Sequence, residues 1–373
     1  MMRQTLLASA AIAALVLPAG LAPAQARTLG FIVSNFTHAS HDGAEDCPDG
    51  LNTDARTYYL QHLPPAERAK YDSEEGKKVL GRILSRGANL LDRQTHNVCT
   101  TPTEFMGPEY LDPNFRTITH TGTAPGMNLD NDDGSGAAPA NVCRHDNFTS
   151  PGGTKGIDNQ WWRLMGCVKY YRPGGDIEKT ALSIIRNGEV SIMLEVTGVD
   201  DMRNDPEVEV GFYSSSEPVQ TDGSGAVMSG TSLMVHENKR FHAIARGRIE
   251  NGVLTTEPAD VHLQDKALII DNEWFLKAAR LRLEIAPDGT AKGMLAGYYD
   301  VETFYNYIRQ SHVATSVNGG YTCPSLYLAL HRLADGFPDA KTGECTAIST
   351  AFVLEAVPGF VIHPRTRTAD AKP

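Results

Sequence analysis

Two stretches decide the expected fold: residues 241–256, FHAIARGRIENGVLTT, and residues 281–296, LRLEIAPDGTAKGMLA. In each stretch, two short strand-forming runs flank a turn dipeptide, Asn251-Gly252 in the first and Asp288-Gly289 in the second. Both dipeptides permit the positive φ that a tight two-residue hairpin needs. Each stretch is therefore predicted to form a β-hairpin.

Other segments extend this β pattern. Residues 189–196 and 208–213 alternate apolar and polar side chains with the period of two that is typical of half-buried strands. Residues 177–185 instead place four apolar side chains at helical spacing, with Asn187-Gly188 as a left-handed helix end. The alternative interpretation makes this dipeptide another hairpin turn. Short strands joined by such turns favour an antiparallel β-sandwich of the jelly-roll kind.

The chain divides into five predicted parts. They are a signal peptide (1–26), a loop-rich, disulfide-tied region (27–170), the antiparallel β-sandwich (171–300), a helical C-terminal cap (301–362) and a disordered tail (363–373). Proline, glycine, asparagine and aspartate crowd the loop-rich region, while apolar side chains at helical spacing mark the cap.

The N-terminus is typical of a secretory signal. Arg3 is followed by a mainly apolar run over residues 6–17, and Ala24-Gln25-Ala26 fits the rule for a cleavage site. The run is shorter than the roughly 20 residues that span a bilayer. We therefore expect cleavage after Ala26 and a secreted or periplasmic protein, with a retained anchor helix as the alternative.

The charge balance narrows the classes of partner. The 373 residues include 34 Lys and Arg against 45 Asp and Glu, which gives a net charge of −11. Proteins that bind nucleic acids or anionic membranes in general need net positive charge. The expected partner is an unknown extracellular ligand, with no nucleic acid and no membrane span.

Six cysteines follow the signal, and an oxidising compartment makes disulfides the default. No C-x-x-C motif occurs, which disfavours a thiolate metal site. Pairing of sequence neighbours is the expectation, although six cysteines allow 15 arrangements. The expected bridges are Cys47–Cys99, Cys143–Cys167 and Cys323–Cys345.

An aspartate-rich segment carries the most distinctive chemistry. Residues 128–134 read NLDNDDG, and alternate positions of an extended turn point to one side. Asn128, Asp130 and Asp132 therefore converge their oxygens, with Asp133 beside them. The segment resembles the calcium loops of EF-hand-like and thrombospondin type-3 repeats, although Asp133 separates the third acid from the glycine. The resemblance implies a Ca²⁺ ligand set of carboxylate and amide oxygens.

Two later acids, Asp146 and Asp158, lie inside the expected Cys143–Cys167 loop. This bridge would fold them back beside the segment and complete an oxygen cage for a structural Ca²⁺ ion. The alternative is a solvated acidic loop in which Asp and Asn act as turn formers. The predicted metal ligands are Asn128, Asp130, Asp132, Asp133, Asp146 and Asp158.

Aromatic and histidine residues provide weaker signals. Of the adjacent pair Trp161 and Trp162, one ring is expected in the core and the other on a ligand platform. His38 and His41 offer two imidazoles to zinc, but an exposed, loosely ordered segment is the favoured interpretation. The common serine hydrolase motifs are missing.

The sequence thus predicts an exported, calcium-stabilised binding or structural module for a carbohydrate or cell-envelope component. The alternative is a secreted hydrolase that acts on polysaccharide or another extracellular polymer. Neither the composition nor any motif decides whether the protein is an enzyme.

Overall fold

The structure is a computed structural model, and it describes most of the chain after the predicted signal. The described residues are 26–53, 57, 60–61, 63–81, 100–108, 111–112, 114–120, 122–133, 135, 139–140, 142–265, 272–310 and 323–364. Residues 1–25 of the predicted signal and most of the predicted tail lie outside these ranges. Among the described residues, no helix has both the length and the apolar character needed to cross a membrane.

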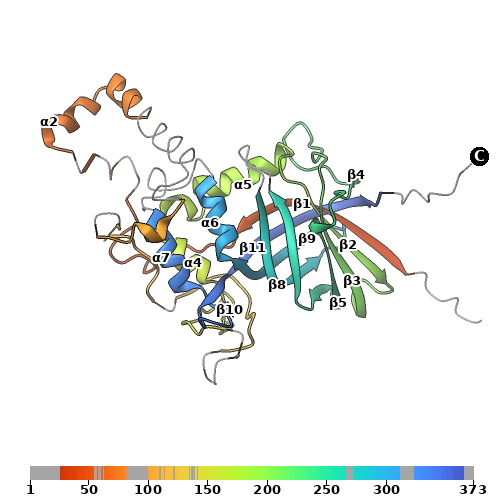
Figure 1. Ribbon diagram of the computed structural model, residues 1–373. Coiled ribbons are helices and arrows are strands. Elements are labelled where there is room, and N and C mark those ends of the chain that lie inside the picture. The colour runs from red at the N-terminus through yellow and green to blue at the C-terminus, as the bar shows by residue number, and fades with distance from the viewer. Residues whose placement is uncertain are drawn as a thin grey trace, which may run out of the picture.

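The architecture is mainly β (Figure 1). The strands are β1 (Arg27–His38), β2 (Ile192–Val199), β3 (Asn204–Ser214), β4 (Thr231–Met234), β5 (His242–Glu250), β6 (Val253–Thr256), β7 (Ala259–Asp265), β8 (Asn272–Ile285), β9 (Ala291–Asp300), β10 (Gly336–Pro338) and β11 (Cys345–Ile362). Eight of them pair in the order β1-β2-β3-β5-β6-β8-β9-β11, and β11 pairs back with β1. Every step of this ring is antiparallel, so the sheet closes into an eight-stranded barrel.

The predicted sandwich is therefore wrong. The closing contact runs from Phe31 opposite Pro358 to His38 opposite Phe352, with one irregularity between Val33 and Asn35. Alternation and turn dipeptides specify antiparallel hairpins, but they do not specify whether the outer strands meet. Here the ring is completed by two strands that the sequence did not predict. β1 forms in the region that was expected to be loop-rich, and β11 forms in the segment that was expected to be helical.

The predicted helical cap is also not formed as expected. The segment begins with α6 (Val301–Gln310) and α7 (Cys323–Leu333), but it then returns to the sheet as β10 and the 18-residue β11. Most side chains in the first part of β11 are buried. Its neighbours on both sides, β1 and β9, hold it as a central strand.

The local predictions around the turns are confirmed. β5 and β6 form a hairpin in which Asn251 and Gly252 have φ values of 54° and 83°. β8 and β9 form a second hairpin, where Gly289 has a φ of 83°. The helix predicted over residues 177–185 is also confirmed, because α5 (Asp176–Arg186) ends before Gly188, whose φ is 72°.

Helices cover one end of the barrel. Figure 1 shows α5 and α6 at that end, with α4 (Gln160–Met165) and α7 beyond them. Ile184 and Ile185 of α5 and Phe304 and Ile308 of α6 are buried in the same core as the inward side chains of the strands. The remaining short helices are α2 (Pro65–Arg68) and the 3-10 turns η1 (Ala69–Tyr71), η2 (Pro102–Glu104), η3 (Lys169–Tyr171) and η4 (Lys239–Phe241).

The long segment before α4 packs on the outside of the barrel. Leu129 is buried there in a second, smaller cluster with outward side chains of β9 and β11, including Tyr298 and Ala347. Arg163 of α4 organises this segment from within, because its guanidinium donates to the carbonyl oxygens of Ile118, His120 and Asp146. The segment is thus held by side-chain hydrogen bonds where regular strand pairing is scarce.

The disulfides differ from the neighbour pairing. Cys47 bonds to Cys167, and Cys143 bonds to Cys345, across sequence separations of 120 and 202 residues. All three predicted bridges, Cys47–Cys99, Cys143–Cys167 and Cys323–Cys345, are therefore wrong. Cys323 is also disulfide-bonded, and Cys99 lies outside the described residues. The bridges connect the loop-rich region to α4 and to the start of β11, and disulfides of this kind are compatible with an extracellular location.

Barrel closure requires a close approach of two glycines. A Cβ atom on Gly30 of β1 would lie 2.3 Å from the carbonyl oxygen of Gly359 in β11. Since that contact is with backbone, no side-chain rotation relieves it. Only glycine fits at this position of the closing strand pair.

We expect Gly30→Val to lower the free energy of unfolding by about 1–3 kcal/mol or more, because the added atoms push β1 from β11. Thermal and urea unfolding of the purified protein measure the loss. Gly223→Val is the control, since a Cβ at Gly223 meets no atom within 4 Å. Equal stability of the two variants would contradict the close approach.

Candidate functional site

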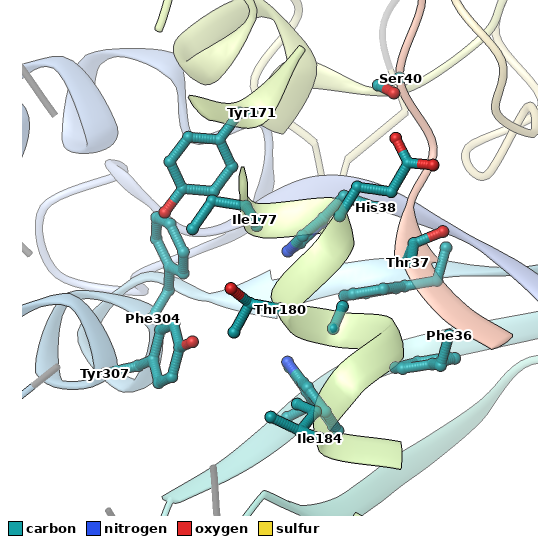
Figure 2. Close-up of a pocket in the computed structure, with 14 residues that line it drawn as sticks. Phe36, Thr37, His38, Ser40, Tyr171, Ile177, Thr180, Ile184, Phe304 and Tyr307 are labelled. Carbon is teal, nitrogen blue, oxygen red and sulfur yellow. The ribbon is translucent and has the colours of Figure 1, made fainter. Parts of the chain in front are cut away.

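A pocket lies at the helix-covered end of the barrel (Figure 2). Its cavity volume is about 60 Å³, and the barrel wall and two helices form its lining. The strands supply aromatic side chains and one histidine, while α5 and α6 close the opposite side. The lining residues are Phe36, Thr37, His38, Ser40, Tyr171, Ile177, Glu178, Thr180, Ala181, Ile184, Trp274, Phe304, Tyr307 and Phe352.

Strand alternation explains why these rings meet. In β1, Phe36 and His38 lie opposite Leu354 and Phe352 of β11, so both point to the barrel interior. Phe36 stacks on Phe352 with 4.4 Å between ring centroids, and Trp274 of β8 meets Phe36 edge-on at 5.1 Å. These three rings form the floor of the pocket.

His38 is the one imidazole in this lining. Its ring stacks on Trp161 of α4 with centroids 3.5 Å apart and planes 4° apart. Burial lowers the pKa of His38 to about 3. The imidazole is therefore neutral at physiological pH, so one ring nitrogen donates a hydrogen bond and the other accepts one.

The polar atoms of these rings have few protein partners. The Nδ1 atom of His38 lies 3.5 Å from the hydroxyl of Thr350, at the limit of a hydrogen bond. No described residue forms a hydrogen bond with its Nε2 atom or with the indole nitrogen of Trp274. An apolar pocket with a few convergent polar atoms is typical of sites for small molecules.

The predicted calcium segment is structured by contacts within the protein. Asp132 is buried and pairs with Arg144, whose guanidinium lies 2.7 and 3.0 Å from its two carboxylate oxygens. Asp130 accepts a hydrogen bond from the backbone of Asp132 at 2.7 Å, and Asp133 accepts one from the backbone of Ser135 at 3.0 Å. The Arg144 side chain and backbone hydrogen bonds within the turn thus occupy three of the six predicted ligands.

Asp158 lies against this segment, as predicted, but in a buried position. Its Oδ2 atom accepts the Leu129 amide at 2.6 Å, and only 3% of the residue is exposed. Burial and the nearby charge of Asp130 raise the pKa of Asp158 to about 8. Asp130 itself has a raised pKa, again mainly because of burial.

Asp335 joins this group from the turn between α7 and β10. It accepts the Ser349 amide at 2.6 Å, and burial raises its pKa to about 7. The charges of Asp130 and Asp335 also contribute to the raised pKa of Asp158. The three carboxyls therefore lie close together on the outer side of β9 and β11, with Asp158 and Asp335 buried and Asp130 half-buried, and each has a raised pKa.

The remaining predicted ligands are more scattered. Asp146 is exposed, and its carbonyl oxygen, not its carboxylate, binds Gln160 and Arg163. The Asn128 amide lies 3.4 Å from the carbonyl oxygen of Asp132. Within the described ranges, no three His, Cys, Asp or Glu residues are grouped so that they could hold a metal ion. A calcium ion at this segment stays a prediction.

The tryptophan pair lies elsewhere than expected. Trp161 and Trp162 are both fully buried, so neither ring offers a surface platform. Trp161 instead stacks on the ring of His38. The guanidinium carbon of Arg172 lies over the ring of Trp162, 5.8 Å from the ring centroid. Sequence reasoning missed His38 as a pocket residue, because the only available signal was the alternation in residues 31–38.

No family model, no curated protein and no solved structure matches the chain. The function has to be inferred from the geometry of the two buried sites and the surface around them.

Asp158→Asn should flatten the pH dependence of stability in EDTA. A carboxyl with a raised folded pKa binds a proton that the unfolded chain releases above its ordinary value of 3.8, so stability falls as the pH rises from about 4 to about 8. The variant should gain on the wild type over this range, as measured by urea unfolding.

Asp222→Asn provides the control for this pH series. Asp222 is exposed, and hydrogen bonds from Ser224 lower its pKa, so its removal should bring no gain between pH 4 and pH 8. A parallel pH profile for Asp158→Asn and the wild type would show that Asp158 is ionised in the folded protein.

Proposed function

We propose that this protein is an exported binding protein whose barrel-mouth pocket holds a small, mainly apolar ligand with one hydrogen-bonding group. The observation that supports the proposal is the neutral His38 side chain within a wall of aromatic rings. A neutral imidazole and the Trp274 indole provide hydrogen-bond groups without the cost of burying a charge. Aromatic and aliphatic walls provide the burial that drives binding of an apolar body.

The cavity is too small for a drug-sized ligand unless part of its lining moves. About 60 Å³ is room for a few water molecules, whereas pockets for drug-sized ligands hold about 300–1,000 Å³. A larger ligand therefore needs a shift of α5, which forms one wall. This helix lies between glycines with left-handed backbone, Gly174 with a φ of 71° and Gly188 with a φ of 72°. Such positions accommodate a change of helix angle at both ends.

The lining favours apolar ligands over the carbohydrate that the sequence pointed to. Sugars need several directed hydrogen bonds, while most of the surface that lines this pocket is apolar. A carbohydrate or cell-envelope ligand stays a prediction for other surfaces of the protein. The hydrolase alternative has less support, because the carboxyls with raised pKa, Asp130, Asp158 and Asp335, do not line this pocket.

Thr180→Phe should weaken binding of the fluorescent probe N-phenyl-1-naphthylamine by about tenfold or more, because the new ring fills the pocket. Figure 2 shows Thr180 on the face of α5 that lines the cavity. Titration of the probe, followed by its emission in apolar surroundings, measures the dissociation constant.

Lys179→Phe is the matched control, since Lys179 is the exposed neighbour on the same helix. It adds the same ring outside the pocket and should leave the dissociation constant of the probe within about twofold of the wild-type value. Similar binding to both variants, or none to the wild type, would contradict a ligand site at the barrel mouth.

The calcium part of the predicted function has its own test. If Asp130 and Asp158 bind Ca²⁺ at pH 8, saturation at 100 times the dissociation constant should stabilise the protein by about 2.7 kcal/mol. Thermal unfolding with CaCl₂ and with EDTA measures this shift. Asp130→Asn should abolish it, and identical melting in both solutions would count against the ion.

A further inference from the structure

We infer that the outer surface of the barrel carries an anion-binding groove for an acidic glycan. Four arginines surround it: Arg246 and Arg248 on β5, and Arg280 and Arg282 on β8. The groove is open and has a volume of about 570 Å³. It lies on the outer face of the sheet, whereas the proposed ligand pocket lies at the barrel mouth.

The strand register places the arginines in two rows. Arg248 lies opposite Thr255 of β6, which in turn lies opposite Arg282 of β8. Arg246 and Arg280 occupy the same outward face two residues along their strands. Adjacent strands lie about 4.8 Å apart and alternate residues about 6.7 Å apart, so the four Cα atoms mark a rectangle of roughly 7 by 10 Å.

The groove exists because the strand between the arginines is short. β6 has only four residues, Val253–Thr256, and the chain leaves the sheet at Glu257 and Pro258. Asn128 of the aspartate-rich segment and the preceding Met127 line one side of the groove. Arg280 donates to the carbonyl oxygen of Asn128 at 3.3 Å, which fixes the position of its guanidinium.

Carboxylates compensate only part of the charge of these arginines, and the one that lies directly opposite Arg246 in the sheet is Glu209 of β3. Arg248 has a carboxylate partner, Glu250, at 3.1 Å. In the described part of the chain, neither Arg246 nor Arg282 has a carboxylate oxygen within 4.0 Å, and both are exposed. Two acids, Glu207 and Glu257, also line the groove, so it is not uniformly positive. In a chain with a net charge of −11, this clustering of arginine is a local exception.

Arginine specifies the chemistry of the ligand. Its planar guanidinium pairs in two-pronged fashion with carboxylate, sulfate or phosphate oxygens. Four guanidiniums spread over this rectangle fit a ligand with at least two anionic groups rather than one small ion. No aromatic side chain lines the groove, so the stacking platform that single-stranded nucleic acids use is missing from its described walls. Thr255 adds a hydroxyl that suits sugar hydroxyls.

The test compares two acidic oligosaccharides, trigalacturonate with carboxylates and a heparin hexasaccharide with sulfates, by isothermal titration calorimetry at low salt. At least one should bind the wild type, and the stronger of the two identifies the anionic group. The double variant Arg246→Gln/Arg282→Gln should weaken that binding by about tenfold or more. Glu257→Gln should tighten it by about two- to fivefold.

Arg186→Gln/Arg332→Gln is the matched control, because it removes the same charge from exposed arginines on α5 and α7. Equal weakening by both double variants would show that binding depends only on net charge, and it would contradict a binding site in the groove. The proposal is also overturned if neither oligosaccharide binds, if orthophosphate binds as tightly as either, or if single-stranded DNA binds more tightly. Thr180→Phe should leave glycan binding unchanged, which separates this site from the barrel-mouth pocket.

Discussion

The pairing of β1 with β11 is the constraint on which the structure depends. It joins the first described strand to the last and closes the ring, so that neither strand leaves an unpaired edge. This register places His38 beside Phe352 in the interior. Further back along β11, Ser349 pairs with β9 and its amide binds Asp335. The pocket and the acidic cluster therefore both depend on β11, although they lie on opposite sides of the barrel wall.

The sequence predicts the hairpins and α5 because their determinants are local. A dipeptide that accepts positive φ and an apolar period are readable within about ten residues. Closure of the barrel has no such signal, since residues 27–38 and 345–362 are more than 300 positions apart in the chain. The disulfides fail for the same reason: Cys143 and Cys345 meet because the fold brings them together, and spacing favours other partners.

The candidate sites, too, have some features that the local sequence predicts and others that only the fold creates. Asp158 lies beside Asp130 as predicted, but the antiparallel bridge between Met127 and Asp158 brings them together, and not the expected Cys143–Cys167 disulfide. The countercharge beside them was not predictable, since Arg144 is one of 34 basic residues and nothing marks it as the partner of Asp132. His38 is less predictable still. It resembles an exposed histidine until alternation in a closed barrel turns its ring inward onto Trp161.

Burial lowers the pKa of His38 and raises the pKa of Asp158, so it favours the neutral form of both side chains. His38 stays neutral, so its contribution to stability is lost as the pH falls from about 6.5 toward 3, whereas that of Asp158 is lost as the pH rises from about 4 to 8. The two effects offset each other between about pH 4 and pH 6.5, so their combined contribution to stability is greatest in that range. A cation at the cluster needs ionised carboxylates and must displace the proton that burial favours on Asp158. The predicted calcium ion would therefore compete with this proton, so we expect calcium to bind only where the medium is neutral or alkaline.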